Sequence, residues 1–202
     1  MKYLIVILLS YLIGSSSMSF YIAKLKGVAI TSKGSKNLGA SNAMILMGWK
    51  AGIIVAIHDI FKAFLAVYIA REIAPELPFI GAIAGVSAIY GHIFPFYLKF
   101  KGGKGFASFI GMTLALNYKL ALALMVIIII VTLITDYIVV GTFTTISITP
   151  IYLGIVNHSL ELGLIIALAS LLILYKHREN IPRLINGTEI GLRKAHKGEY
   201  RK

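Results

Sequence analysis

Long apolar segments occupy most of this chain, and only short polar loops separate them. A helix needs about 20 apolar residues to cross the hydrocarbon core of a bilayer. The pattern predicts seven transmembrane helices, over residues 3–22, 49–70, 78–97, 105–116, 120–135, 138–155 and 160–175. We therefore expect an all-α, polytopic membrane protein in which residues 1–202 form a single domain. The segment 105–116 is too short to cross alone, which favours a tilted helix or one that begins inside a protein-lined cavity.

The first apolar segment has some features of a secretory signal peptide. Lys2 precedes it, and Ser15, Ser16 and Ser17 are small residues of the kind found near cleavage sites. The segments that follow are themselves apolar rather than those of a soluble domain. A retained first helix is therefore the better interpretation.

The basic residues are unevenly distributed among the loops. A net charge of +12 would suit a nucleic-acid-binding protein, but the lysines and arginines gather at residues 24–36, at 99–104 and after residue 175. The intervening loops hold only Arg71 and Lys119. By the positive-inside rule, this alternation places the amino terminus outside and the carboxyl terminus in the cytoplasm. The basic tail, about residues 190–202, is expected to lie against anionic lipid headgroups, and no nucleic-acid partner is predicted.

A glycine-rich sequence, Gly102-Gly103-Lys104-Gly105, precedes the short fourth span. Glycine lets backbone N–H groups approach an anion closely, and the lysine supplies a countercharge. The N-terminus of a following helix adds to this attraction. We therefore predict a phosphate-binding loop at the membrane surface. The loop is not a P-loop, because Gly105 stands where Ser or Thr would follow the lysine, and ATP hydrolysis is not predicted.

Two further polar segments adjoin predicted spans. Residues 34–42 read GSKNLGASN and form either a flexible connector or a site whose hydroxyls and amides bind a polar ligand. After the last span, His177, Asn180 and Arg183 recur at a spacing of three and can share one helical face. Pro182 predicts that a new helix starts there. The alternative for this segment is a solvated basic tail.

Ionisable residues also occur inside the spans. His58, Asp59 and Lys62 lie in the second span, where such groups usually face the protein interior. Asp59 and Lys62 are three residues apart, so an internal salt bridge is the favoured interpretation. His92 ends the third span close to the glycine-rich sequence. The chain has no cysteine, and its histidines and carboxylates are too scattered for a metal site, so neither a metal nor a cofactor is predicted.

Together these segments resemble the bacterial acyl-phosphate:glycerol-3-phosphate acyltransferase family, whose members are integral membrane enzymes of phospholipid synthesis. The first family motif, G-S-G-N-x-G-A-[ST]-N-x-x-R, corresponds to residues 34–45, and the second and third resemble GHIFPFYLKFKGGKG and HRENIPRLINGTE. The resemblance implies that a fatty acyl group passes from acyl phosphate to the hydroxyl of glycerol 3-phosphate. The products would be lysophosphatidic acid and inorganic phosphate, formed at the cytoplasmic face of the bacterial inner membrane.

The resemblance also implies site residues and partners. The catalytic residues would be Ser35, Lys104, His177 and Asn180. The substrate-binding residues would be Gly34, Lys36, Asn37, Gly39, Asn42, His92, Gly102, Gly103, Gly105 and Glu179, the last by orienting basic neighbours. Either His177 or the leaving phosphate would accept the hydroxyl proton. The implied partners are the two substrates and the lipid bilayer, and the oligomeric state is left open, a monomer included.

Four positions depart from the family pattern. Lys36 replaces the second glycine of the first motif, and Ile45 replaces its final arginine. Asp136 and Val139 stand where the arginine and the serine of an Arg-Tyr-x-Ser run are common. Isoleucine cannot form the bidentate contact of an arginine with phosphate. Asp136 is expected to repel a phosphate unless a lysine neutralises it. The alternatives to the family reaction are a paralogue that acylates a different hydroxyl acceptor and a non-catalytic lipid-binding protein of the same fold.

Overall fold

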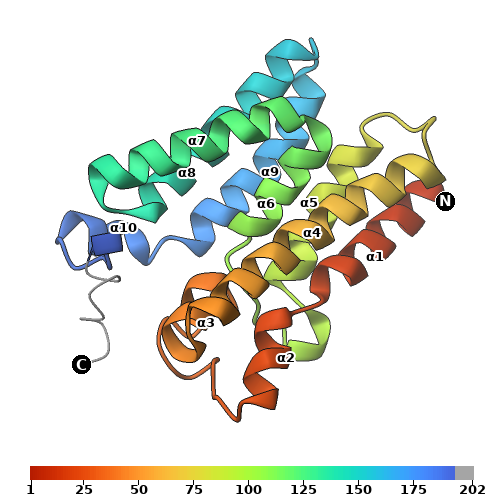
Figure 1. The fold of residues 1–202 in the computed structure, drawn as a ribbon. Coiled ribbons are helices and arrows are strands. Elements are labelled where there is room, and N and C mark those ends of the chain that lie inside the picture. The colour runs from red at the N-terminus through yellow and green to blue at the C-terminus, as the bar shows by residue number, and fades with distance from the viewer. Residues whose placement is uncertain (194–202) are drawn as a thin grey trace. The chain divides into compact units, whose positions relative to one another are not determined.

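The computed structural model describes residues 1–193, and every regular element in that range is helical (Figure 1). The chain divides into two compact units, Met1–Leu116 and Asn117–Lys202. The first contains α1 (Lys2–Ser15), α2 (Met18–Leu25), α3 (Ala40–Met47), α4 (Trp49–Ile73), α5 (Ile80–Ile93), the 3-10 turn η1 (Phe96–Leu98) and α6 (Phe106–Leu116). The second contains α7 (Tyr118–Thr135), α8 (Ile138–Val156), α9 (Leu160–Lys176) and α10 (Asn180–Ile185).

Five helical segments among the described residues are long and apolar enough to cross a membrane. They are Lys2–Leu25, Trp49–Ile73, Ile80–Leu98, Tyr118–Thr135 and Ile138–Val156. The segments predicted as the fourth and seventh spans form helices of 11 and 17 residues, Phe106–Leu116 and Leu160–Lys176. An all-α chain with several membrane-length helices is thereby confirmed, and the count of seven spans stays a prediction.

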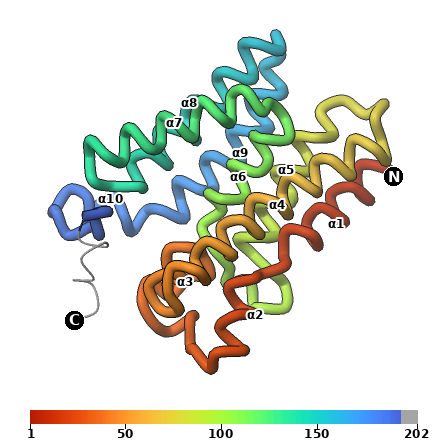
Figure 2. Tube along the Cα trace, in the orientation of Figure 1, coloured from red at the N-terminus to blue at the C-terminus, as the bar shows by residue number. Residues whose placement is uncertain are grey.

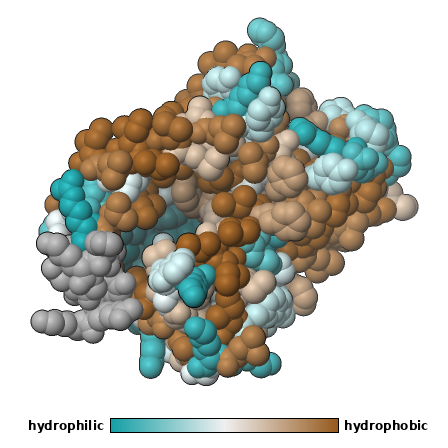
Figure 3. Space-filling view, in the orientation of Figure 1, coloured by the Kyte–Doolittle hydropathy of each residue, from teal (hydrophilic) through white to brown (hydrophobic). Residues whose placement is uncertain are grey.

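Large apolar side chains remain exposed along helices of both units. On α1 they include Leu4, Leu8 and Leu12, and on α7 Leu122, Val126, Ile129 and Leu133. These residues recur every three or four positions, so each set forms a stripe on one helical face. Hydrophobic residues cover both helices in the space-filling view (Figure 3). Stripes of this kind are suited to contact with lipid tails.

The first predicted span is not one continuous helix, because the chain breaks at Ser16 and Ser17 (Figure 2). Ser16 is extended, with ψ 138°, and the Ser17 hydroxyl caps α2 by accepting a hydrogen bond from the Phe20 N–H at 3.3 Å. Serine favours such caps because its short side chain can satisfy an N–H group that the helix leaves free. The break frees the Ser16 carbonyl for a side chain of α4, as described below.

Close helix crossings hold the first unit together. A Cβ at Gly14 of α1 would overlap the backbone of Ala88 on α5, and one at Gly111 of α6 would overlap the backbone of Ile60 on α4. Only glycine permits these approaches, which is the usual role of small residues between membrane helices. The α6 helix, and with it the loop that precedes it, is therefore seated directly on α4.

In the second unit, α8 packs against both α7 and α9. Asp136 makes the turn from α7 to α8 in the left-handed region, with φ 70°. The Ser159 hydroxyl caps α9 by accepting from the Leu162 N–H at 3.1 Å. The chain leaves α9 at Lys176 and re-enters a helix at Asn180, so the predicted restart near Pro182 is confirmed.

Candidate active site

A buried asparagine organises the loop of the first motif. Asn42, on α3, is fully buried, and its Nδ2 donates to the carbonyl oxygens of Asn37, Ile30 and Lys33 at 2.9, 3.1 and 3.3 Å. Its Oδ1 accepts from the Ser35 N–H at 3.0 Å. A Cβ at Gly34 would overlap this same oxygen. The Asn42 amide is thus engaged with the loop backbone, and it fixes the loop rather than presenting a free group to a ligand.

A second, smaller turn within this loop presents Ser35. The Asn37 Nδ2 donates to the Ser35 Oγ at 2.9 Å, and the Asn37 Oδ1 accepts from the Gly39 N–H at 2.8 Å, where α3 begins. Asparagine commonly stabilises turns by bonding the backbone two residues on. Ser35 is exposed, and its hydroxyl proton has no acceptor within residues 1–193. That proton is available to a substrate oxygen.

The two departures in the first motif occupy different environments. Lys36 is exposed and has φ 55°, the left-handed region that favours the glycine found there in the family motif. Ile45 is half-buried on α3, three residues from Asn42 and therefore on a neighbouring part of the same helical face. Lys36 thus keeps the backbone geometry of the glycine that it replaces.

The glycine-rich loop is attached to the end of α5. The Gly102 N–H donates to the Ile93 carbonyl at 3.0 Å, and the Gly103 N–H donates to the His92 carbonyl at 3.2 Å. A Cβ at Gly102 would overlap the His92 carbonyl, and one at Gly103 would overlap the His92 Nε2. Close packing therefore explains these two glycines, and their own N–H groups are engaged by α5 rather than directed at an anion.

The end of this loop forms the start of α6. Gly105 has φ 96°, and its carbonyl accepts the Phe109 N–H at 2.9 Å, so the N–H groups of the intervening residues precede the helical ladder. Half-buried Lys104 adds a positive charge beside them. The Leu38 N–H donates to the Gly102 carbonyl at 3.4 Å, which brings the first motif next to the glycine-rich loop. The first motif and the glycine-rich loop thus lie side by side within the first unit.

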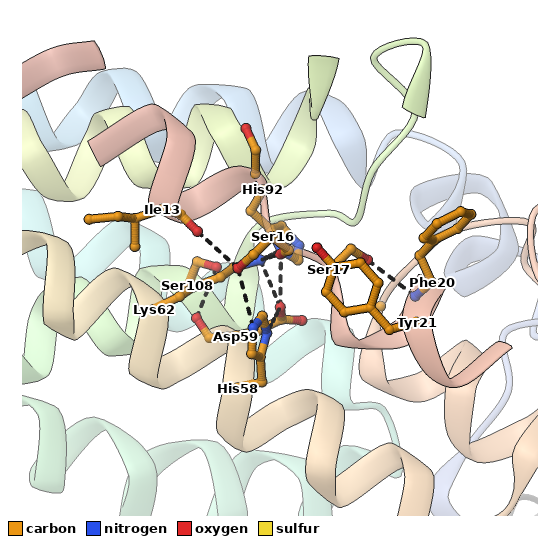
Figure 4. A network of polar contacts seen from close by, with 12 residues as sticks. Ile13, Ser16, Ser17, Phe20, Tyr21, His58, Asp59, Lys62, His92 and Ser108 are labelled. Atoms are coloured by element: carbon orange, nitrogen blue, oxygen red, sulfur yellow. Dashed lines mark hydrogen bonds and ion pairs between the residues drawn. The ribbon is translucent and has the colours of Figure 1, made fainter. Parts of the chain in front are cut away.

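His92, which contacts Gly103 of this loop, belongs to a cluster of buried ionisable groups drawn in Figure 4. The Lys62 Nζ lies 2.8 Å from the Asp59 Oδ1 and 2.9 Å from the His92 Nδ1, and it donates to the Ser16 carbonyl at 2.7 Å. The His58 Nε2 lies 3.2 Å from the Ser16 Oγ. The predicted Asp59–Lys62 ion pair is confirmed. The contact of Lys62 with His92, 30 residues further along the chain, was not predicted.

In the second unit, His177 is buried at the end of α9, and the edge of its ring faces Phe143, with ring centroids 6.0 Å apart. Its Nδ1 lies 2.8 Å from the Ile173 carbonyl. A carbonyl oxygen can only accept, so Nδ1 carries a proton, and in the neutral ring the lone pair is on Nε2. His177 is therefore oriented with Nε2 as its basic atom.

A carboxylate that the sequence analysis missed holds the third motif together. The Glu189 Oε1 accepts from the Asn180 Nδ2 at 2.7 Å, and its Oε2 accepts from the Arg183 Nε at 2.8 Å. Glu179, which was predicted to orient basic neighbours, is exposed and forms no capping hydrogen bond at the start of α10. The Asn-Gly pair before Thr188 was the available signal, because it favours the chain reversal that returns Glu189 to Arg183.

Asp136 is paired with the chain that follows α10. Its Oδ1 accepts from the Arg193 N–H at 2.9 Å and lies 3.9 Å from the Arg193 Nε, and its carbonyl accepts from the Leu192 N–H at 2.8 Å. A Cβ at Gly191 would overlap this carboxylate. An arginine, rather than the lysine considered above, thus offsets the charge of Asp136.

The chain is similar to known proteins over nearly its whole length. The family model described as glycerol-3-phosphate acyltransferase matches residues 4–187. The chain belongs to this family. Glycerol-3-phosphate acyltransferases of Clostridioides difficile and Shewanella sediminis are 36% and 37% identical to it, covering 93% and 95% of this chain and 94% and 95% of theirs.

The fold of this family member also matches solved structures. The crystal structure of PlsY (YgiH), an integral membrane glycerol 3-phosphate acyltransferase, in its glycerol 3-phosphate form is 30% identical, with a TM-score of 0.90 over 97% of this chain and 98% of that one. Its lysophosphatidic acid form gives a TM-score of 0.85 over 95% of each. The family resemblance and the integral membrane fold are therefore confirmed.

Proposed function

We propose that this protein transfers a fatty acyl group from an acyl phosphate to the hydroxyl of glycerol 3-phosphate, releasing inorganic phosphate and lysophosphatidic acid. The observation that carries this proposal is the end-to-end match to PlsY, whose two structures are described as a glycerol 3-phosphate form and a lysophosphatidic acid form. These ligands are the acceptor and the product of one acylation reaction. The retained Ser35, Lys104, His177 and Asn180 support an active rather than a silent member of the family.

The acyl phosphate is already activated, so the protein has mainly to position the reactants and stabilise charge. The acceptor hydroxyl oxygen attacks the acyl carbon, a new ester C–O bond forms, and the bond from that carbon to the phosphate oxygen breaks. We assign the released proton to the His177 Nε2, because the Ile173 carbonyl holds the other ring proton on Nδ1. Proton acceptance by the leaving phosphate itself is the competing route.

The remaining site residues divide into two groups. Lys104, Gly105, the first turn of α6 and the Ser35 hydroxyl are assigned to the phosphate groups, with exposed Lys36 adding positive charge nearby. The other group positions them. It comprises Gly34, Asn37, Gly39 and Asn42 around Ser35, His92, Gly102 and Gly103 beside Lys104, and Glu189 beside Asn180.

We assign the site to the cytoplasmic face of the bacterial inner membrane, with seven spans in one membrane-embedded domain, the amino terminus outside and the carboxyl terminus inside. The alternation of basic loops supports this orientation. Because the chain has no cysteine, single cysteines report topology directly. A Ser32→Cys variant should react with a membrane-impermeant maleimide only in opened cells, and Asn157→Cys should react in intact ones. The reverse pattern would invert the proposed topology.

The reaction is tested with purified protein in detergent micelles, palmitoyl phosphate and radiolabelled glycerol 3-phosphate. We expect lysophosphatidic acid and inorganic phosphate in equal amounts. A panel with glycerol and other hydroxyl acceptors separates the alternatives raised by Ile45. Acylation of another hydroxyl but not of glycerol 3-phosphate would identify a paralogue, and no turnover with any acceptor would leave a non-catalytic lipid-binding protein.

A further inference from the structure

We propose that the buried cluster of Asp59, Lys62 and His92 is a positioning device for the glycine-rich loop of the acyl-transfer site. This inference rests on the proposed function, because it assigns the cluster a role in placing Lys104 for phosphate. The cluster lies wholly within the first unit, on α4 and at the end of α5 (Figure 4).

Each of the three N–H groups of the Lys62 ammonium has a hydrogen-bond partner. An ammonium has three N–H donors and no acceptor. Its three partners are the Ser16 carbonyl at 2.7 Å, the Asp59 Oδ1 at 2.8 Å and the His92 Nδ1 at 2.9 Å. The break between α1 and α2 supplies the first of these, since a carbonyl within a continuous helix would be engaged in the helical ladder. The cluster therefore joins three helical segments at one nitrogen.

The contact with Lys62 determines which ring nitrogen of His92 carries the proton. Because Lys62 donates to Nδ1, that nitrogen carries no proton, and the proton of the neutral ring is on Nε2. The Asp59 Oδ1 lies 3.4 Å from the same Nδ1, beyond the usual N–H···O distance, and it accepts a hydrogen bond from the Lys62 ammonium instead. The ring thus has one tautomer and one orientation.

His92 in turn places the front of the loop. Its carbonyl accepts the Gly103 N–H, and its Nε2 occupies the space where a side chain of residue 103 would lie. A rotation or shift of the ring would therefore displace the Gly103 α-carbon and the neighbouring Lys104. The next carbonyl along α5, that of Ile93, holds Gly102 in the same way.

The back of the loop is attached to the same turn of α4. The buried Ser108 hydroxyl, in the first turn of α6, donates to the Asp59 carbonyl at 3.1 Å. Gly111 then rests on the backbone of Ile60. Residues 102–105 are consequently held at both ends by the turn of α4 that carries Asp59 and Lys62. The charged groups act on the front of the loop through His92, and the backbone of the same turn of α4 holds its back through Ser108.

The first test compares the kinetics of the wild-type protein with those of a folded variant that lacks the charges of Asp59 and Lys62. Lys62→Met alone leaves the buried Asp59 carboxylate without its lysine, facing only the His58 and His92 Nδ1 atoms at 3.5 and 3.4 Å. The variant of choice is therefore the double change Asp59→Ala with Lys62→Met. We expect kcat/KM for acyl transfer to fall about 10- to 100-fold, because small misplacements at an active site have effects of this size. The matched control is Lys50→Met, the same substitution at an exposed position of the same helix. A folded double variant with unchanged kcat/KM would overturn the inference.

A double-mutant cycle tests the contact itself. In Gly103→Ala the new methyl group meets the His92 ring, and His92→Ala removes that obstacle. We expect the combined variant to be about fivefold or more less impaired than the product of the two single losses. Gly154→Ala, where a Cβ meets only ordinary contacts, is the control for the glycine change. Strictly multiplicative losses would refute a positioning contact.

The tautomer can be measured without turnover. In protein with 15N-labelled histidine, the resonances that disappear in His92→Gln identify His92. We expect the Nε2–H tautomer in the wild type and a mixture in the Asp59→Ala, Lys62→Met variant. An Nδ1–H or doubly protonated His92 in the wild type would overturn the inference whether or not the protein is active. The expected tautomer in a protein that turns over no acyl phosphate would refute only the proposed function.

Discussion

The stability of the Asp59–Lys62 pair gives the sharpest physical prediction. The two side chains are 3% and 4% exposed, and Lys62→Met removes three hydrogen bonds, of which the shortest contact of the Asp59 carboxylate is one. Asp59 then faces only the His58 and His92 Nδ1 atoms, at 3.5 and 3.4 Å. Breaking a buried pair on one side costs about 3–5 kcal/mol, because the remaining charge is left without compensation. At about 2–4 °C per kcal/mol for a chain of this size, the unfolding midpoint should fall by roughly 6–20 °C.

The assay is thermal unfolding of the purified protein in one detergent, followed by circular dichroism. Two further variants serve as controls for the midpoint of Lys62→Met. Adding Asp59→Ala to Lys62→Met should recover most of the lost stability, because an apolar replacement of both partners is often close to neutral. Lys2→Met removes a lysine from the ion pair with Glu76, whose side chains are 62% and 51% exposed, and should leave the midpoint nearly unchanged. A Lys62→Met midpoint equal to that of Lys2→Met would refute the argument from burial.

Four further predictions concern the site. Lys104→Ala should raise the KM for acyl phosphate about tenfold or more in initial-rate assays, because a charge-assisted phosphate contact is lost; unchanged donor kinetics would mean that the loop only connects helices. Lys36→Gly should stabilise the protein by about 1 kcal/mol in thermal unfolding, since it relieves a left-handed backbone; a loss of stability would contradict this. Ile45→Arg should raise kcat/KM for glycerol 3-phosphate several-fold, and flat activity would show that Lys36 or another group already serves the acceptor. Glu189→Gln should lower kcat about tenfold by loosening Asn180, and wild-type kinetics would exclude that role.

The sequence predicted the helices well and their interruptions less well. The spans 49–70 and 138–155 lie within one to three residues of α4 and α8. The break at Ser16 was missed because hydropathy averages over a window, and three serines do not outweigh the apolar residues on either side. Their preference for helix caps was the available local signal. A helix break predicted from these serines would also have indicated a backbone carbonyl free to accept from another side chain, as Ser16 does from Lys62.

For the candidate site, the contacts of several residues differ from those that the sequence suggested. Glycine, asparagine and lysine at 34–42 and 102–105 suggested anion binding through backbone and side-chain groups. The structure instead engages the Asn42 amide and the Gly102 and Gly103 N–H groups internally. Such assignments depend on contacts between residues distant in sequence, which spacing along one chain does not encode. Glu189 was missed for the same reason, since its role arises from a chain reversal.

Each departure from the family pattern can change the backbone conformation, the charge of the side chain, or both. Lys36 retains the left-handed backbone of a glycine, so the turn that presents Ser35 survives the substitution. Asp136 also adopts a left-handed φ, which aspartate tolerates, and its carboxylate is used by Arg193 and the chain after α10. Neither change therefore disrupts the geometry on which catalysis is proposed to depend. Ile45 is different, because a half-buried aliphatic side chain cannot bind phosphate as the arginine of the family motif can. We therefore expect acceptor specificity to depend on residue 45 more than on Lys36 or Asp136, and Ile45→Arg is the substitution that tests this.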